Sequence, residues 1–294
     1  MTATSVEWPT VLLIAAFWCA LTTTVVLADL VPTALTIVLL LLLGGFYGSL
    51  QHEVIHRHPT SRQWLNRCLV VVPLSLFMPF DRYRQTHLQH HASDLTNPAE
   101  DPESYYVTAQ EWRQSGSIGR LILVTNRTLV GRLTLGPGLG MGRYWRADLR
   151  LAHTDRRVAV TWMWHGLGVA GIVAIIIASP LQLWVYLVGF VYGGLALTML
   201  RSFAEHCGDP TRERTAVVAT GRFFSLLFLN NNLHIAHHDS PSTPWYELPT
   251  VGLELAIAER AHQGGTYYHG YRDVARQYGL HQFCQVVHPD PDQP

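Results

Sequence analysis

The stretch Ala34–His56 reads ALTIVLLLLLGGFYGSLQHEVIH and joins the two features that decide the fold. Its part up to Leu50 carries no charge and approaches the length of about 20 residues with which an apolar helix crosses a bilayer. His52 and His56 follow four residues apart, so on a continued helix both imidazoles lie on one face. The stretch therefore predicts a membrane-spanning helix that ends in a pair of possible metal ligands.

Three further apolar windows are long enough to span a membrane: Val11–Leu27, Val158–Ala178 and Leu181–Leu200. The first lacks the basic start and the small-residue cleavage site of a signal peptide. Very short connections at Ala28–Thr33 and Ser179–Pro180 join the spans into two tight hairpins. We therefore predict an all-α integral membrane protein with four transmembrane helices in two hairpins. The remaining segments, 51–157 and 201–294, are expected to form a helical cap, all within one domain over residues 1–294.

The distribution of positive charge predicts the orientation of the spans. The chain has no lysine, so its 21 basic residues are all arginines, and each lies within Gln51–Arg157 or after Leu200. The positive-inside rule places these segments, and with four spans both termini, in the cytoplasm, which for a bacterial protein means the inner face of the plasma membrane. A formal net charge of zero gives no reason to expect nucleic-acid binding.

Two smaller features complete the reading of composition. The four cysteines, Cys19, Cys68, Cys207 and Cys284, show no framework spacing, and we expect reduced thiols. The glycine-rich stretch Gly136–Gly142 matches no nucleotide-binding fingerprint and is predicted to be a flexible turn.

Seven more histidines follow, and six of them stand in triplets that repeat the spacing of His52 and His56. They form two triplets and one isolated position on the same arginine-rich side: His87, His90 and His91; His234, His237 and His238; and His206. A structural zinc ion needs only four donors, whereas nine imidazoles would fill most of two coordination spheres. Imidazole ligands suit iron, zinc, copper and nickel, so we predict a two-metal centre.

Carboxylates beside the histidines are candidates for orienting the imidazole rings. Those adjacent in sequence are Glu53, Asp94, Glu205 and Asp239. Asn230 or Asn231 could hold a metal-bound water, or could cap the helix that carries His234.

These histidine boxes, in this order, resemble the membrane fatty acid desaturase family. The resemblance rests on His52-x-x-x-His56, His87-x-x-His90-His91 and His234-x-x-His237-His238, with Arg201-Ser-Phe-Ala-Glu205-His206 between the last two. It also includes the local sequences LTNPAEDPESYY and HIAHHDSPSTPWYELP, and it extends from about Gly45 to Pro249.

The resemblance implies a non-haem di-iron centre (Fe2+/Fe3+) on the cytoplasmic side of four spans, with all nine histidines as ligands. It implies an enzyme that uses O2 and two electrons to desaturate or hydroxylate an unactivated alkyl chain. The chain has no haem-binding cytochrome b5-like extension and no cysteine set for an iron–sulfur cluster, so we expect an external electron donor of the ferredoxin, rubredoxin or cytochrome b5 type. One departure is Ser202, where the acyl-CoA branch of the family carries an asparagine.

Several alternatives remain open. Hydroxylases and ketolases that act on carotenoids or on small lipid-like metabolites share similar boxes. His52-Glu53-Val54-Ile55-His56 also satisfies the H-E-x-x-H pattern of a zinc metalloprotease, although that reading leaves six histidines without a role. A metal transporter would need ionisable residues inside the spans, which are almost free of charge. We interpret the chain as an O2-dependent desaturase of a fatty-acyl or related aliphatic chain.

Overall fold

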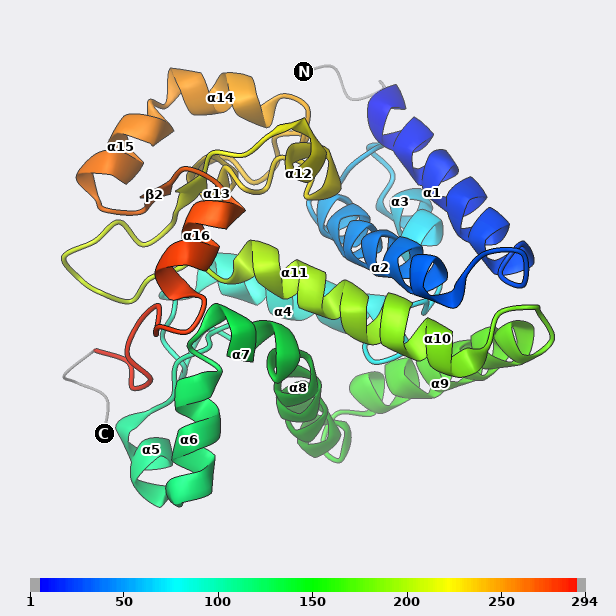
Figure 1. The fold of residues 1–294 in the computed structure, drawn as a ribbon, viewed down its shortest axis with the longest axis horizontal. Coiled ribbons are helices and arrows are strands. Elements are labelled where there is room, and N and C mark those ends of the chain that lie inside the picture. The colour runs from blue at the N-terminus through cyan, green and yellow to red at the C-terminus, as the bar shows by residue number, and fades with distance from the viewer. Residues whose placement is uncertain (1–5, 290–294) are drawn as a thin grey trace. The chain divides into compact units, whose positions relative to one another are not determined.

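The computed structural model describes residues 6–289, which are mostly helical (Figure 1). Four helical segments are long and apolar enough to cross a membrane, as predicted. They are α1 (Trp8–Val26), α2 (Thr33–Ile55), α9 (Arg156–Ile177) and the segment Leu183–Ser202, which comprises α10 (Leu183–Tyr186), the π-helix η1 (Leu187–Gly193) and α11 (Gly194–Ser202). The largest difference from the predicted bounds is at α2, which continues past Leu50 to Ile55 and so carries His52.

The chain divides into two compact units, and each unit is built from two stretches of sequence. Among the described residues, unit 1 comprises 6–84 and 137–198, and unit 2 comprises 85–136 and 199–289. All four apolar segments lie wholly or mainly in unit 1, and the second and third histidine boxes lie in unit 2.

Glycines allow the helix backbones of unit 1 to approach closely. A Cβ atom added to Gly194 would lie 2.7 Å from the Cα atom of Gly44, and one added to Gly45 would lie 2.7 Å from a methyl group of Leu197. Small residues at such a crossing are typical of helices that pack within a membrane, where close van der Waals contact replaces the hydrophobic effect. The fourth span is thereby fixed against α2, the helix that carries the first histidine box.

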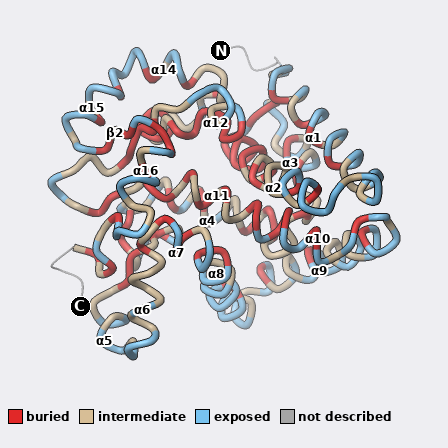
Figure 2. Tube along the Cα trace, viewed as in Figure 1, coloured by how far each residue is buried: buried red, intermediate tan, exposed pale blue. Residues whose placement is uncertain are grey.

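Apolar side chains also cover outward-facing parts of the spans. Leu12, Leu167 and Ile177 are all more than half exposed, and Figure 2 shows much of α1 and α9 in the colour of exposed residues. Exposed leucine and isoleucine along a long helix suit a lipid surrounding rather than water.

Two further helices complete unit 1: α3 (Gln63–Val70) and α8 (Gly136–Ala152). The prediction of a flexible turn at Gly136–Gly142 is wrong, because this stretch begins α8. A buried ion pair holds that helix in place: Asp148 accepts hydrogen bonds from Arg82 at 2.7 and 2.8 Å and from the indole nitrogen of Trp162 at 2.8 Å. Tertiary contacts of this kind override a weak local helix propensity.

Unit 2 combines short helices with a minimal sheet. Helix α4 (Phe80–Ala92) begins in the last residues of the first stretch of unit 1 and ends in unit 2. The other elements are α5 (Ala109–Gln114), α6 (Ser117–Thr125), α7 (Leu129–Thr134), α12 (Arg222–Leu227), α13 (His234–Asp239), α14 (Leu248–Glu254), α15 (Ile257–Gln263), α16 (Tyr271–Tyr278), and the parallel strands β1 (Val217–Val218) and β2 (Tyr267–Tyr268).

Candidate metal centre

Helix α4 presents the second histidine box on one side. His87 and His91 are one turn apart, and their Nε2 atoms are 3.2 Å from each other. His90 lies between them in sequence, and both His87 and His90 are almost fully buried. The helix that carries these histidines begins seven residues before His87, at Phe80.

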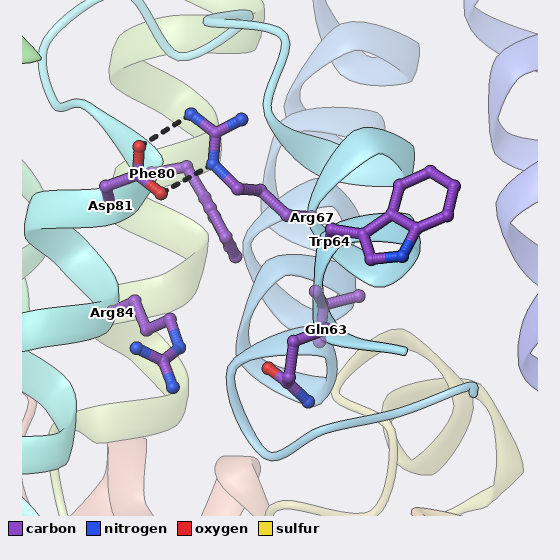
Figure 3. Close-up of a pocket in the computed structure, with 7 residues that line it drawn as sticks. Gln63, Trp64, Arg67, Phe80, Asp81 and Arg84 are labelled. Atoms are coloured by element: carbon purple, nitrogen blue, oxygen red, sulfur yellow. Dashed lines mark hydrogen bonds and ion pairs between the residues drawn. The ribbon is translucent and has the colours of Figure 1, made fainter. Parts of the chain in front are cut away.

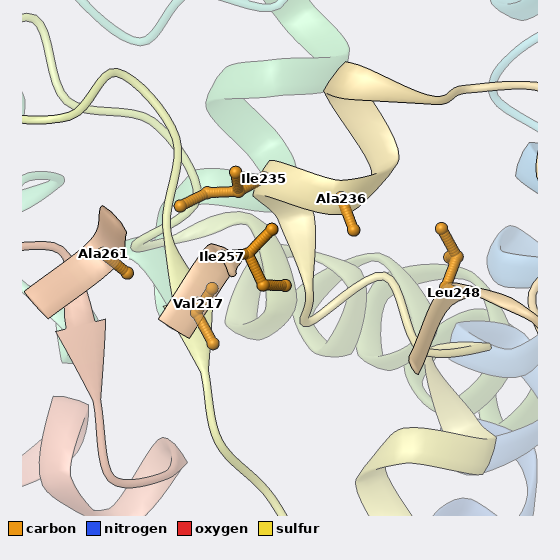
Figure 4. Close-up of a cluster of buried hydrophobic side chains, with 6 residues drawn as sticks. All are labelled: Val217, Ile235, Ala236, Leu248, Ile257 and Ala261. Carbon is orange, nitrogen blue, oxygen red and sulfur yellow. The ribbon is translucent and has the colours of Figure 1, made fainter. Parts of the chain in front are cut away.

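Helix α13 presents the third box and is held by packing rather than by its length. Ile235 and Ala236 are completely buried, in a cluster with Val217, Leu248, Ile257 and Ala261 (Figure 4). The histidines of the same short helix are thereby fixed, and the Nε2 atoms of His234 and His238 are 3.1 Å apart.

The isolated histidine joins the third box through an irregular segment. His206 follows α11 and forms an antiparallel bridge with Thr215. Its Nε2 atom lies 2.9 Å from that of His234, and its ring centroid lies 4.7 Å from that of His90.

Unit 2 thus brings seven predicted ligands into two groups. One group is His90, His206, His234 and His238, whose candidate ligand atoms all lie within 4.8 Å of one another. The other contains His87, His91 and His237, with the Nε2 atoms of His91 and His237 3.1 Å apart. Neutral imidazoles have one N–H donor each, so nitrogen atoms converging this closely are better satisfied by a shared cation than by one another. The donor sets therefore fit metal ions.

The electrostatics of four of these seven histidines favour the neutral, metal-binding form of imidazole. Burial lowers the pKa of His91 to about 3, with help from the neighbouring His87 and His90. Burial, together with the surrounding imidazoles, also holds the pKa values of His206, His234 and His238 well below the ordinary value. A metal ion would not have to compete with protons for these nitrogens near neutral pH.

Carboxylates orient two of the rings in the second box. Nδ1 of His90 donates to Asp101 at 2.8 Å, and Nδ1 of His87 donates to Glu103 at 2.9 Å. Such bonds fix the tautomer in which Nε2 carries the lone pair that binds a metal ion. Sequence reasoning missed both residues, although they lie in the stretch LTNPAEDPESYY that follows the second box.

Two of the residues predicted around the metal site lie beside the third box. Nδ1 of His234 lies 3.1 Å from the side-chain oxygen of Asn231 and 3.6 Å from a carboxylate oxygen of Glu205. Glu205 is itself 3.1 Å from Nε of Arg201, one turn earlier. Burial raises the pKa of Glu205 to about 7, although Arg201 opposes this rise.

The other predicted orienting residues of unit 2 have different partners. Asp94 and Asp239 form ion pairs with Arg214 and Arg260, respectively, near the surface. Asn230 donates to the carbonyl oxygen of Trp245 at 2.9 Å. The prediction that Asn230 or Asn231 caps α13 is wrong, because the N-cap residue is Leu233 and no side chain caps the helix.

In unit 1, His52 lies in the last turn of α2 and His56 follows as its C-cap, with ring centroids 4.9 Å apart. Glu53 belongs to a separate group with Glu7 and His58, and Nδ1 of His58 donates to Glu7 at 2.7 Å. His165, inside the third span, donates to the carbonyl oxygen of Leu76 at 2.9 Å.

A cavity of about 230 Å³ lies beside this end of α2 (Figure 3). Val54, Phe80 and Trp64 give it apolar walls, and its polar residues are Gln63, Arg67, Asp81 and Arg84. Arg67 donates two hydrogen bonds of 2.7 Å to Asp81, and Figure 3 shows Arg84 apart from that pair. Val54 lies in sequence between His52 and His56, so the cavity adjoins the first histidine box.

Comparison with known families agrees with this site. A family model described as fatty acid desaturase matches residues 28–272, which is most of the chain and includes all three histidine boxes. No curated protein sequence matches the chain.

Proposed function

The chain belongs to the fatty acid desaturase family, and from this membership and the histidine groups we propose that it is a membrane di-iron oxidoreductase that desaturates a fatty-acyl or related aliphatic chain. The observation that carries the proposal is the convergence of imidazoles from the second and third boxes and from His206. A zinc protease site holds its metal ion with few protein ligands, so it would not need so many histidines.

We assign one ion to His90, His206, His234 and His238. For the other ion we assign His87, His91 and His237, together with His52 and His56 of the first box. This assignment of the first box rests on the family pattern and on the shared face of the two histidines at the end of α2.

Iron ions held by these ligands would supply the redox chemistry, in which O2 takes four electrons, two from a donor and two from the substrate, while the alkyl chain loses two hydrogens and two water molecules form. The residues of this chain prepare the site for that chemistry. Asp101 and Glu103 hold the imidazole N–H groups, and burial of His90 and His234 keeps bulk water away from the ligands.

The substrate is an apolar chain with a polar head, and the cavity beside α2 is suited to the head. Arg84 offers a cation there, and Phe80 and Trp64 offer apolar walls. A carboxylate or phosphate head would form a charge-assisted hydrogen bond with the guanidinium group. The exposed apolar faces of the spans support a position of the alkyl chain within the bilayer.

The two electrons are delivered by a separate protein of the ferredoxin, rubredoxin or cytochrome b5 type. The arginine distribution supports an orientation with the histidine boxes and both termini in the cytoplasm.

The test is expression in a host with defined lipids, followed by mass spectrometry of lipids and small metabolites and by metal analysis of the purified protein. We expect two iron ions per chain and a product two hydrogens lighter than its substrate. His90→Ala and His237→Ala should each lose iron and product, whereas the exposed, stacked His262→Ala should lose neither.

The other outcomes are equally informative. A gain of one oxygen would replace desaturation by hydroxylation, and oxo products on carotenoids would indicate a ketolase. A single zinc ion per chain, with full turnover in both histidine variants, would refute the di-iron proposal.

A further inference from the structure

Two cysteines that are 77 positions apart in the sequence meet in unit 2. The Sγ atoms of Cys207 and Cys284 are 3.5 Å apart, and both thiols are free. Cys207 is fully buried and directly follows His206, whereas Cys284 is half-buried in the segment after α16.

The backbone on both sides of this contact is fixed by hydrogen bonds. The amide of Cys207 donates to the carbonyl oxygen of Arg214 at 3.1 Å, and the next amide, of Gly208, donates to the hydroxyl of Tyr106 at 2.9 Å. On the other side, Phe283 donates to the carbonyl oxygen of Arg127 at 2.9 Å.

The carbonyl oxygen next to Cys284 is held as well. The guanidinium group of Arg127 donates to the carbonyl oxygen of Gln285 at 2.6 and 3.0 Å, and Val107 donates to that of Val286 at 3.1 Å. The two sulfur atoms therefore face each other on held segments of chain and do not meet by a chance rotation of mobile loops.

An arginine lies beside the buried sulfur. Nη1 of Arg212 lies 3.7 Å from Sγ of Cys207 and can donate a hydrogen bond to it. The exposed Cys19 and Cys68, by contrast, have no second cysteine beside them among the described residues.

We propose that Cys207 and Cys284 are a redox-active dithiol that closes to a disulfide when hydrogen peroxide is present. The half-buried Cys284 meets the oxidant first: its sulfur attacks the O–O bond, a sulfenic acid forms, and the departing hydroxide takes the thiol proton to give water. The sulfur of Cys207 then attacks that sulfur, the S–S bond forms as the S–O bond breaks, and the departing hydroxide takes the thiol proton of Cys207 to give a second water. Two thiols lose two electrons in total, and one peroxide becomes two waters.

Closure requires only a short movement. The S–S bond is about 2.0 Å long, so the sulfur atoms must approach by about 1.5 Å. The bond would tie the C-terminal segment to the residue next to His206, one of the proposed iron ligands. Peroxide from incomplete O2 reduction would in this way switch the enzyme off reversibly, and this consequence, unlike the bond itself, rests on the proposed function.

The test is a peptide map of the full-length protein purified under reducing conditions. The protein is treated with hydrogen peroxide or with diamide, free thiols are blocked with N-ethylmaleimide, and the product is digested with trypsin. Cleavage after Arg201, Arg212 and Arg276 puts the two cysteines on different peptides, 202–212 and 277–294. We expect these peptides to be joined, with the mass of two hydrogens lost, and dithiothreitol to separate them.

Matched variants test the pairing. Cys284→Ser should abolish the joined peptide, and Cys68→Ser should leave it unchanged. The proposal is overturned if Cys207 and Cys284 of the unaltered protein both remain open to the maleimide after oxidation and denaturation, or if they become sulfinic acids without a joined peptide. Because the map reads a covalent bond, it can succeed or fail independently of whether the protein is a desaturase.

Discussion

Asp101 accepts a hydrogen bond of 2.8 Å from Nδ1 of His90, and both side chains are only 2% exposed. The same carboxylate accepts hydrogen bonds from the backbone amides of Thr96 and Glu103, so its position is set by the loop after α4. The orientation of a proposed ligand in the second box therefore depends on a residue 11 positions later in the chain.

Asp101→Asn should weaken metal binding without unfolding the protein, because the amide oxygen can still accept one backbone hydrogen bond but no longer carries charge to support His90. Loss of such an orienting carboxylate lowers metal affinity about 10- to 100-fold. Iron content after dialysis against graded chelator measures the effect. Asp94→Asn is the control, since Asp94 is partly exposed and pairs with Arg214; equal iron loss in both variants would contradict the assigned role of Asp101.

The close approach of α2 and the fourth span should make Gly194→Ala destabilising. The added Cβ atom would lie 2.7 Å from the backbone of Gly44, and overpacking of this kind costs about 1–3 kcal/mol. Thermal unfolding in detergent measures the change. Gly171→Ala in α9 is the matched control, because a Cβ atom there meets nothing within 4 Å, and it should leave the unfolding midpoint unchanged or slightly raised.

Asp148→Asn should destabilise unit 1 strongly. The carboxylate pairs with Arg82 where both side chains are at most 7% exposed, and removing one partner of a buried pair costs about 3–5 kcal/mol. Asp81→Asn breaks the pair with Arg67, whose side chains are 42% and 47% exposed, and should cost at most about 1 kcal/mol. The measurement is the loss in free energy of unfolding of each variant. Similar losses would show that burial does not set how much these ion pairs contribute to stability.

Arg84→Ala should raise KM about tenfold or more and leave kcat nearly unchanged, if the cavity beside α2 holds an anionic head group. The expected size is that of one lost charge-assisted hydrogen bond, and an effect on binding alone appears in KM. Steady-state kinetics with the identified substrate provide the measurement. Arg62→Ala, an exposed arginine outside the cavity, is the comparison, and an unchanged KM in Arg84→Ala would place the head group elsewhere.

The sequence was most informative where periodicity and chemistry coincide. Apolar windows predicted the four spans, and a spacing of three or four residues predicted that the histidines of α4 would share one side. Contacts that depend on loops were not predictable in this way. Asp101 and Glu103 lie in an irregular segment, and nothing in the spacing of Cys207 and Cys284 indicates that they meet.

Local preferences also misled in two places. An asparagine before a helix usually caps it, but Asn230 has a left-handed φ of 56° and turns its side chain towards Trp245. A run of glycines usually forms a turn, but the buried pair of Asp148 and Arg82 holds α8 as a helix.

The third histidine box stands on a helix of only six residues. A peptide of that length has no helical stability of its own in water, so the segment relies on Ile235 and Ala236 in their apolar cluster and on whatever the histidines bind. On the proposed function that ligand is iron, so newly made chains in a cell short of iron would keep this segment loosely folded and open to proteases. The amount of protein in the membrane would then follow the iron supply without any change in gene expression.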